Sequence, residues 1–366
     1  MKLSFEGKKH EKEILVNDVN VVLPDYNDNT NKLIFGDNLI ALKALLYKYN
    51  LKGKVDLIYI DPPFSTNNVF KAGKRTQTIS MGNDDKVAYE DVIVGDEFLE
   101  FIRERLVIAR ELLSDNGSIY LHIDYKIGHY IKIIMDEVFG AENFKNDITR
   151  VKCNPKNFNR KAYGNVKDLI LFYSKSKNNI WNECYTEYTQ EDISKLYKKV
   201  KDGRYYTTVP LHAPGETKNG DTSKTFKGIA VPSGRHWRCS PSELEELDKQ
   251  GRIEWSKNGV PRRIIYADEK LGKKAQDIWD FKDPQYPVYP TEKNIDLLTR
   301  IIKTSSNENS LVLDFFCGSG TTLLAAEKLN RRWIGVDKSK VALDTSFNKL
   351  EENKTMLSKA IEVINI

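Results

Sequence analysis

The chain has 366 residues, of which 40% are hydrophobic and 30% charged, and its net charge is +5. This length and composition are typical of a soluble globular protein with one large domain and a smaller one, and they exclude a low-complexity chain. The weakly basic balance permits nucleic-acid binding without requiring it.

Cysteine usage and hydropathy exclude further classes. The four cysteines lie far apart and include no Cys-x-x-Cys pair, which indicates neither a disulfide framework nor a zinc site. We find no signal peptide and no apolar stretch of membrane-spanning length. We therefore expect a cytoplasmic protein with no metal ion and no membrane partner.

The first predicted strand follows a polar N-terminal arm, residues 1–30, to which we assign no function. The strand is Leu33–Phe35, and the leucine-rich stretch Leu39–Leu46 after it has helical spacing. Asp37 or Asn38 can cap that helix, since both side chains accept hydrogen bonds from backbone N–H groups.

The next predicted strand, Val55–Ile60, is short and apolar, and Asp61-Pro62-Pro63-Phe64 follows it directly. Proline fixes φ and carries no N–H, so this segment forms a rigid platform. A carboxylate, the carbonyl of Pro62 and an aromatic ring suit an exocyclic amine on a planar heterocycle. The amine donates to the two oxygens, and the ring stacks on Phe64. Taken alone, such a segment is more often an ordinary strand-to-loop turn.

Alternating helices and strands come next. The polar residues 65–95 predict a loop beside Asp61, either a lid or a disordered segment. A helix, a strand, a helix and a strand are then predicted at residues 96–114, 118–123, 127–138 and 169–173. The alternation predicts an α/β fold with a mostly parallel sheet and helices on both faces. His122 is predicted inside a strand, where a core role is commoner than a catalytic one.

Two basic stretches interrupt this alternation. Residues 149–161 mix basic residues with asparagine and an aromatic, as in an exposed charged loop. Residues 176–284 are rich in Lys, Gly, Tyr and Trp. Basic side chains neutralise phosphates, and Arg and His can read base edges. Such an insertion is often plain solvated surface, but its position between two halves of one domain favours a recognition role.

A glycine-rich motif stands near the end of the chain. Leu311–Asp314 predicts a strand, and Phe315-Phe316-Cys317-Gly318-Ser319-Gly320 a turn into a helix, where backbone N–H groups can approach a ligand. The following strand ends in Asp337, an acid where nucleotide-binding units hold a ribose. Leu323 replaces the third glycine of the dinucleotide fingerprint, which favours a nucleoside ligand without a pyrophosphate. The tail after Ser339 is predicted to be helical.

In this order the two motifs resemble the β-class amino-methyltransferases of DNA. In that family an Asp-Pro-Pro-Tyr/Phe catalytic motif precedes a Phe-x-Gly-x-Gly cofactor-binding motif, as Asp61–Phe64 and Phe316–Gly320 do here. The resemblance covers most of the chain and implies a Rossmann-like, mostly parallel methyltransferase sheet with an inserted target-recognition region. The implied divisions are an N-terminal arm, a catalytic half, the target-recognition region and a cofactor-binding half, at residues 1–30, 31–175, 176–284 and 285–366.

The resemblance also implies the ligands, which are S-adenosyl-L-methionine and a base of double-stranded DNA. The catalytic residues it implies are Asp61, Pro62, Pro63 and Phe64. Asp37 is placed near the cofactor adenine. Thr291, which is also a natural N-cap, and Lys293 belong to a Pro-Thr-x-Lys-Pro segment at the methionine part, although Asn294 replaces its last proline. The other implied cofactor-binding residues are Asp314, Phe315, Phe316, Cys317, Gly318, Gly320 and Asp337.

The implied DNA-binding residues come from both basic stretches. Asn154, Phe158 and Arg160 lie in the segment that faces the base pocket in the family. In the target-recognition region the implied residues are Arg235, His236, Trp237, Arg238, Arg262 and Arg263.

Asp at the first position of the catalytic motif usually accompanies adenine in this family, and Ser accompanies cytosine. The resemblance thus predicts an adenine-N6 methyltransferase of a restriction-modification system, type II or type III Mod-like. A cytosine-N4 enzyme, a methyltransferase acting on RNA or protein amides, and a non-catalytic subunit stay open. The implied partners are a homodimer mate and a cognate restriction endonuclease. Every version with catalysis requires Asp61 and Gly318 to lie at adjoining strand ends of one sheet.

Overall fold

The computed structural model describes residues 2–63, 68–72, 86–91, 95–155, 161–285, 287, 289 and 292–366. The chain forms two compact units. The first unit consists of two segments, Met1–Cys184 and Gln276–Ile366, and the second is Tyr185–Ala275, which separates those segments in the sequence. The inserted unit lies within the stretch 176–284, where the α/β alternation is lost. No helix in the described ranges combines the length and the apolar character needed to cross a membrane.

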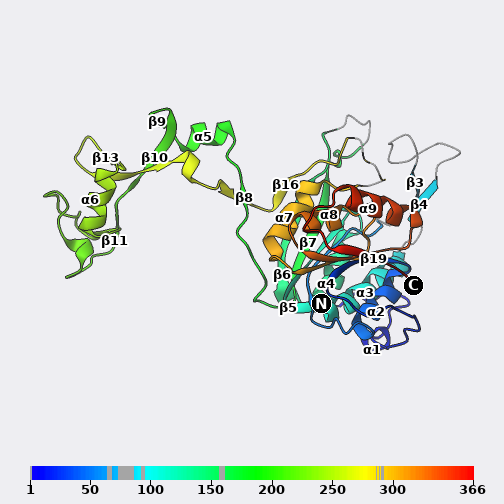
Figure 1. Ribbon diagram of the computed structural model, residues 1–366. Helices are drawn as coiled ribbons and strands as arrows, with labels where there is room; N and C mark the ends of the chain where they lie inside the picture. The colour runs from blue at the N-terminus through cyan, green and yellow to red at the C-terminus, as the bar shows by residue number, and fades with distance from the viewer. Residues whose placement is uncertain are drawn as a thin grey trace. The chain divides into compact units, whose positions relative to one another are not determined.

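In the described part of the first unit, nine strands form one sheet (Figure 1). Their order is β16-β6-β7-β5-β2-β17-β18-β1-β19. Strand β7 is antiparallel to both neighbours, and the other neighbouring pairs are parallel. The strands are β1 (Thr30–Phe35), β2 (Val55–Ile60), β5 (Leu113–Ile123), β6 (Phe144–Val151), β7 (Lys167–Ser174), β16 (Ile278–Asp280), β17 (Leu311–Asp314), β18 (Arg332–Asp337) and β19 (Ala360–Asn365).

Helices cover both faces of this sheet. They are α1 (Glu11–Ile14), α2 (Asn38–Tyr47), α3 (Gly95–Leu112), α4 (Gly128–Phe139), η1 (Ala141–Asn143), α7 (Ile295–Ser305), α8 (Thr321–Lys328) and α9 (Lys340–Glu352). Ile58 and Ile60 of β2 belong to the core cluster of α2, α3 and α4, whereas Leu57 and Tyr59 belong to that of α7 and α8. Burial on both faces explains why the central strands are continuous apolar runs. The predicted α/β fold with a mostly parallel sheet is confirmed.

Two predicted segments differ from the structure. The described parts of the loop predicted at 65–95 include an antiparallel strand pair, β3 (Asn68–Ala72) and β4 (Lys86–Asp91). The tail after Ser339 is not helical throughout, because α9 is followed by β19, which pairs with β1. Isolated short strands are hard to recognise in sequence because their stability comes from the partner strand.

The inserted unit is built around a small antiparallel sheet of order β13-β14-β10-β9. Its elements are β8 (Tyr185–Thr186), α5 (Gln190–Leu196), β9 (Lys199–Lys201), β10 (Arg204–Pro210), β11 (His212–Pro214), η2 (Asp221–Ser223), β12 (Arg235–Trp237), α6 (Pro241–Lys249), β13 (Ile253–Trp255), β14 (Pro261–Tyr266), η3 (Ala267–Glu269) and β15 (Lys273–Lys274). Leu211, Phe226, Trp237, Leu244 and Ile253 form a compact core of its own.

Candidate active site

Four neighbouring strands of the large sheet each lead into an aspartate at the same edge. Asp61 follows β2, Asp314 ends β17, Asp337 ends β18, and Asp37 lies two residues after β1. Strands β2 and β17 pair in parallel, so Asp61 and the glycine turn after Asp314 leave the sheet side by side. The adjacency that the sequence analysis required is therefore present.

The two oxygens of the Asp61 carboxylate have different surroundings. Oδ2 lies 2.5 Å from Nζ of Lys293. Oδ1 is buried and accepts no hydrogen bond from any described residue. The side chain as a whole is 17% exposed. One oxygen is thus fixed by a cation, and the other is an acceptor with no hydrogen-bond donor among the described residues. Pro62 is buried and Pro63 partly so, while Phe64 lies outside the described residues.

Lys293 reaches Asp61 from the segment before α7. Asn294 caps this helix, because its side chain accepts the N–H of Asp296 at 2.8 Å. The predicted N-cap at Thr291 is therefore wrong for α7, and Thr291 itself lies outside the described residues. The amide oxygen of Asn294 accepts the capping hydrogen bond that the Thr291 hydroxyl was expected to accept.

The glycine turn holds its shape through two left-handed residues. Gly318 has φ +49° and Gly320 has φ +74°, and Gly320 forms the N-cap of α8. The N–H of Gly318 donates to Oδ2 of Asp337 at 2.9 Å, and its carbonyl accepts from Ser346 Oγ at 2.6 Å. A Cβ at Gly320 would lie 2.8 Å from Ser346 Oγ, whereas one at Gly318 would meet only the Tyr289 ring at 3.7 Å. The turn is closed on the Gly320 side and open at Gly318.

Two predicted cofactor-binding residues turn their side chains away from this edge. Phe315 is fully buried in the core, and its carbonyl accepts a hydrogen bond from Asn38 Nδ2 at 2.8 Å. Cys317 is buried too, and burial raises the pKa of its thiol well above the ordinary value. Both residues can serve a ligand only through their backbone. The neighbouring Phe316 is half-buried.

The carboxylates of this edge perturb one another. Burial, together with the charges of Asp61 and Asp337, raises the pKa of Asp314 to about 7. Burial also raises the pKa of Asp337, whose oxygens accept the N–H groups of Gly318 and Ser339. Crowded carboxylates in a buried site favour a ligand that carries positive charge and hydroxyl donors.

Asp37 is held by an arginine that the sequence analysis did not single out. Its Oδ1 caps α2, and its Oδ2 lies 3.4 Å from Arg105 Nη2. Arg105 is buried, and its Nε donates to Asn38 Oδ1 at 2.5 Å. Its guanidinium carbon Cζ lies 3.5 Å from the ring centroid of Phe101. The ring centroids of Phe101 and Phe316 are in turn 6.1 Å apart. In the sequence, Arg105 shows only that it belongs to a helical pattern, that of α3. Such a pattern does not indicate a role in ligand binding.

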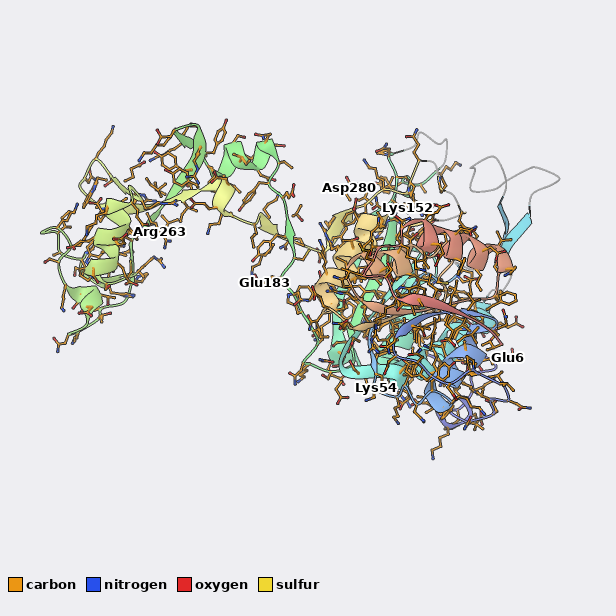
Figure 2. The ribbon with its side chains drawn as sticks, in the orientation of Figure 1. Glu6, Lys54, Lys152, Glu183, Arg263 and Asp280 are labelled. Carbon is orange, nitrogen blue, oxygen red and sulfur yellow. The ribbon has the colours of Figure 1, made fainter. Side chains whose placement is uncertain are left out.

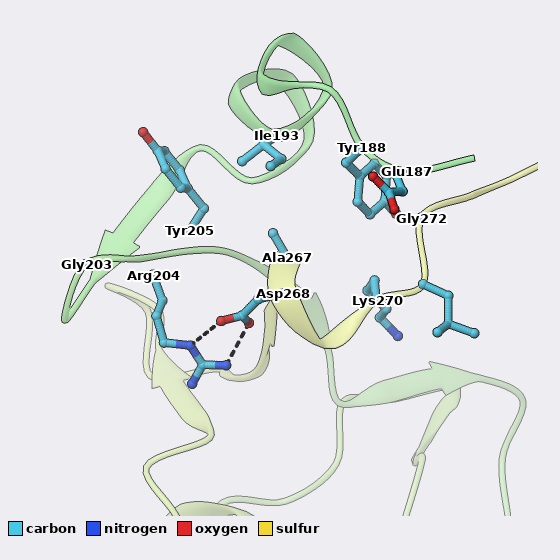
Figure 3. Close-up of a pocket in the computed structure, with 11 residues that line it drawn as sticks. Glu187, Tyr188, Ile193, Gly203, Arg204, Tyr205, Ala267, Asp268, Lys270 and Gly272 are labelled. Atoms are coloured by element: carbon cyan, nitrogen blue, oxygen red, sulfur yellow. Dashed lines mark hydrogen bonds and ion pairs between the residues drawn. The ribbon is translucent and has the colours of Figure 1, made fainter. Parts of the chain in front are cut away.

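The basic residues of the inserted unit fall into two groups. Arg204 and Arg252 form ion pairs with Asp268 and Glu269, and Arg204 borders a pocket of about 330 Å³ (Figure 3). No carboxylate of the described residues forms an ion pair with the other group, Arg235, Arg238, Arg262 and Arg263, which we call the unpaired arginines. Three of them, Arg235, Arg238 and Arg262, contribute with burial to the lowered pKa of His212.

One predicted DNA-binding residue is corrected by the structure. Trp237 is 0% exposed and donates its indole N–H to the carbonyl of Lys224 at 3.0 Å. It therefore holds β12 against the small core and cannot stack on a base. Its neighbour His236 is half-buried and bonded to the Gly215 carbonyl. Asn154 is exposed, and Phe158 and Arg160 lie outside the described residues.

The chain has a mostly parallel sheet with a glycine turn and a row of acids at one edge. These features are typical of the class of α/β proteins that bind a nucleoside-like ligand. The chain belongs to the DNA methylase family, which residues 55–348 match. This confirms the family predicted from the two motifs.

The similar proteins include restriction-modification enzymes. The type II methyltransferase M.EcaI of Enterobacter cloacae is 40% identical over 86% of this chain and 68% of its own length. The Mod subunit of the type III enzyme StyLTI of Salmonella typhimurium is 30% identical over 90% of this chain and 56% of its own length. The chain thus spans about half to two thirds of these relatives. A solved M1.HpyAVI–SAM complex is 20% identical, with a TM-score of 0.46 over 87% of this chain and 100% of that chain.

Proposed function

We propose that this protein is a site-specific DNA methyltransferase that moves the methyl group of S-adenosyl-L-methionine to N6 of an adenine extruded from double-stranded DNA. The observation that carries the proposal is the pairing of β2 with β17. It brings the amine acceptor Asp61 next to the glycine turn, so that donor and acceptor sites adjoin.

The residues at the sheet edge fit the methyl donor. Gly318 leaves room for close approach to its backbone, and Asp337 and Asp37 supply carboxylates for hydroxyl and amine donors. The half-buried ring of Phe316 offers a flat apolar surface. Bound S-adenosyl-L-methionine supplies an electrophilic methyl group on a sulfonium, and its positive charge suits the acids of this edge.

Asp61 and Pro62 act on the amine. Asp61 Oδ1 and the carbonyl oxygen of Pro62 accept its two hydrogens, which localises the nitrogen lone pair otherwise shared with the ring. Lys293 orients the carboxylate through the other oxygen. Catalysis then consists of positioning and of stabilising the positive charge that develops on nitrogen.

The target base must leave the duplex, at a cost of a few kcal/mol. Phosphate contacts are needed to offset this, and the unpaired arginines of the inserted unit are the residues that we assign to them. We infer from the two relatives named above that methylation protects DNA from a cognate restriction endonuclease.

Transfer of labelled methyl groups to DNA, RNA and protein tests the proposal. We expect label in double-stranded DNA and, after digestion, in N6-methyladenine. N4-methylcytosine would correct the base but keep the enzyme class, and label confined to RNA or protein would refute DNA as the substrate. Sequencing that maps modified bases then gives the recognition site.

A further inference from the structure

A row of buried polar side chains crosses the sheet behind Asp61. Tyr59, His122, Asp168 and Arg150 stand on the four neighbouring strands β2, β5, β7 and β6. Arg150 pairs directly with Asp168, and each member of the row lies on the sheet face that also bears the α7–α8 core. Asp61 continues the row, two residues after Tyr59.

His122 lies between two carboxylates. Its Nδ1 is 3.0 Å from Tyr59 Oη and 3.9 Å from Asp61 Oδ1, and its Nε2 is 3.4 Å from Asp168 Oδ2. The ring is 0% exposed. Burial lowers the pKa of His122, opposed by the nearby charges of Asp168 and Asp61. A neutral imidazole has one N–H and one lone pair, so a proton on Nε2 facing Asp168 leaves Nδ1 to accept the hydrogen of the Tyr59 hydroxyl. Asp61 Oδ1 lies on the same side of the ring, beyond hydrogen-bond distance.

Neighbouring cations keep Asp168 ionised, so its carboxylate can balance a positive charge on the His122 ring. Lys152 Nζ lies 2.7 Å from its Oδ1, and Arg150 Nη1 lies 3.9 Å from its Oδ2. Burial opposes ionisation of Asp168, but His122 and Lys152 outweigh it and lower the pKa of this carboxyl. The row ends at the sheet margin, where Lys152 follows β6 and Asp280 ends its partner β16 (Figure 2).

We propose that His122 is a positioning residue that accepts, through Asp61, the proton lost by the methylated amine, while Asp168 stabilises the resulting imidazolium. The inference rests on the proposed function. The nitrogen lone pair forms the new N–C bond as the C–S bond breaks, and the C–S electron pair stays on sulfur. One amine proton moves to Asp61 Oδ1 and on to His122 Nδ1, where the Tyr59 hydroxyl changes from donor to acceptor. The N–H electron pair restores a neutral amine.

Two features of the row support this path. Asp61 Oδ1 is the oxygen without a hydrogen-bond donor among the described residues, and it is the one that faces His122. The path requires a side-chain rotation of Asp61 that shortens the 3.9 Å separation to hydrogen-bond distance, about 2.9 Å. The proton returns through Asp61 to water once the product leaves. The ionisable groups around the ring in the described residues are Tyr59, Asp61, Lys293 and Asp168.

Single-turnover methyl transfer to DNA, measured as a function of pH, tests the role of the ring. His122→Asn keeps a polar group near the Nδ1 position but cannot take up a proton. We expect it to slow transfer roughly 100-fold and to remove the fall in rate at acid pH, with cofactor affinity unchanged. The control is Tyr120→Phe on the same strand, which removes a buried polar group outside the row, the hydroxyl bonded to Ser305. The control should keep both rate and pH profile.

The outcomes separate this inference from the proposed function. If the native protein methylates DNA and His122→Asn keeps its rate and pH profile, the proton path is wrong and the function stands. If the native protein transfers no methyl group to DNA, both fall. Asp168→Asn leaves the ring intact and should also slow transfer, because the imidazolium loses its counter-charge; an unchanged rate there would likewise overturn the path.

Histidine NMR provides a readout that does not depend on turnover. The chain has five histidines, so a sample with isotope-labelled histidine gives few signals, and His122→Asn identifies the one of interest. We expect a neutral ring with its proton on Nε2, and a titration that shifts to lower pH in both Asp61→Asn and Asp168→Asn. A ring protonated on Nδ1, or one that does not respond to Asp61, would contradict the coupling.

Discussion

Asp61 carries the proposed chemistry through a single oxygen, Oδ1, because Lys293 occupies the other. Replacing the carboxylate by an amide removes the negative charge that balances the charge developing on the amine nitrogen, whether the amide presents its oxygen or its NH₂ group. We predict that Asp61→Asn lowers the methyl-transfer rate by roughly 10²–10³-fold, as loss of one preorganised charge-stabilising group does. Calorimetry should show that cofactor binding persists.

The control for this variant lies on the same strand. Asp56 stands at the opposite end of β2, where it accepts hydrogen bonds from Ser114 Oγ and from the N–H of Leu311. Asp56→Asn makes the same chemical change away from the site and should leave the rate unaltered. Equal loss of activity in the two variants would argue for a general structural effect.

Asp314 links the site to the stability of the fold. Its pKa is raised to about 7 from an ordinary value of 3.8, so between these values the native state holds a proton that the unfolded chain has released. Stability contributed by this group is therefore lost as the pH rises from about 4 to about 7, by on the order of 4 kcal/mol. Asp314→Asn should abolish that part of the pH dependence, measured by urea unfolding at both ends of the range.

The same group predicts a proton release on ligand binding. A cation placed beside Asp314 favours its ionised form. Cofactor binding near neutral pH should then release a proton, seen calorimetrically as a binding enthalpy that depends on the buffer. Binding without proton release in the native protein, or with undiminished release in Asp314→Asn, would contradict the assignment.

At the scale of an element, the turn between β17 and α8 offers a matched pair of glycines. Both have positive φ, so alanine costs about 1–2 kcal/mol of strain at either. At Gly320 the new Cβ also meets Ser346, and we predict a further loss of about 1–3 kcal/mol in unfolding free energy. Gly318→Ala should destabilise less but weaken cofactor binding more. Denaturant unfolding and calorimetry of both variants give the comparison.

The reverse ranking would show that the open side of the turn has been misassigned. Gly320 packs against α9, so its effect belongs to the fold, whereas the N–H of Gly318 and the carboxylate of Asp337 form one unit at the ligand side. This division explains why two glycines of one motif have different physical roles.

At the scale of the whole molecule, the two groups of arginines in the inserted unit predict different effects on DNA affinity. Replacing an exposed unpaired arginine such as Arg263 by glutamine should weaken binding and reduce the slope of log affinity against log salt by about 0.9 for each phosphate that is no longer neutralised. Arg204→Gln is the control, because Asp268 and Glu269 already neutralise that guanidinium. Equal salt slopes for native protein and Arg263→Gln would exclude Arg263 from the interface.

The sequence by itself determined the family, the mostly parallel α/β fold and the residues of both motifs. These features are local. Apolar runs report burial, prolines after β2 set backbone angles, and glycines at Gly318 and Gly320 permit the left-handed turn, whatever the rest of the chain does. The order of the two motifs, read along the chain, then supplied the resemblance.

Only the tertiary structure decided which side chains meet. The pairing of β2 with β17, the contact of Lys293 with Asp61 and the row through His122 join residues far apart in the chain. The burial of Trp237 and the neutralised state of Arg204 likewise depend on partners that no periodicity names. Hydrophobic spacing states that a face is buried but not against what, so these contacts arise only when the sheet is assembled.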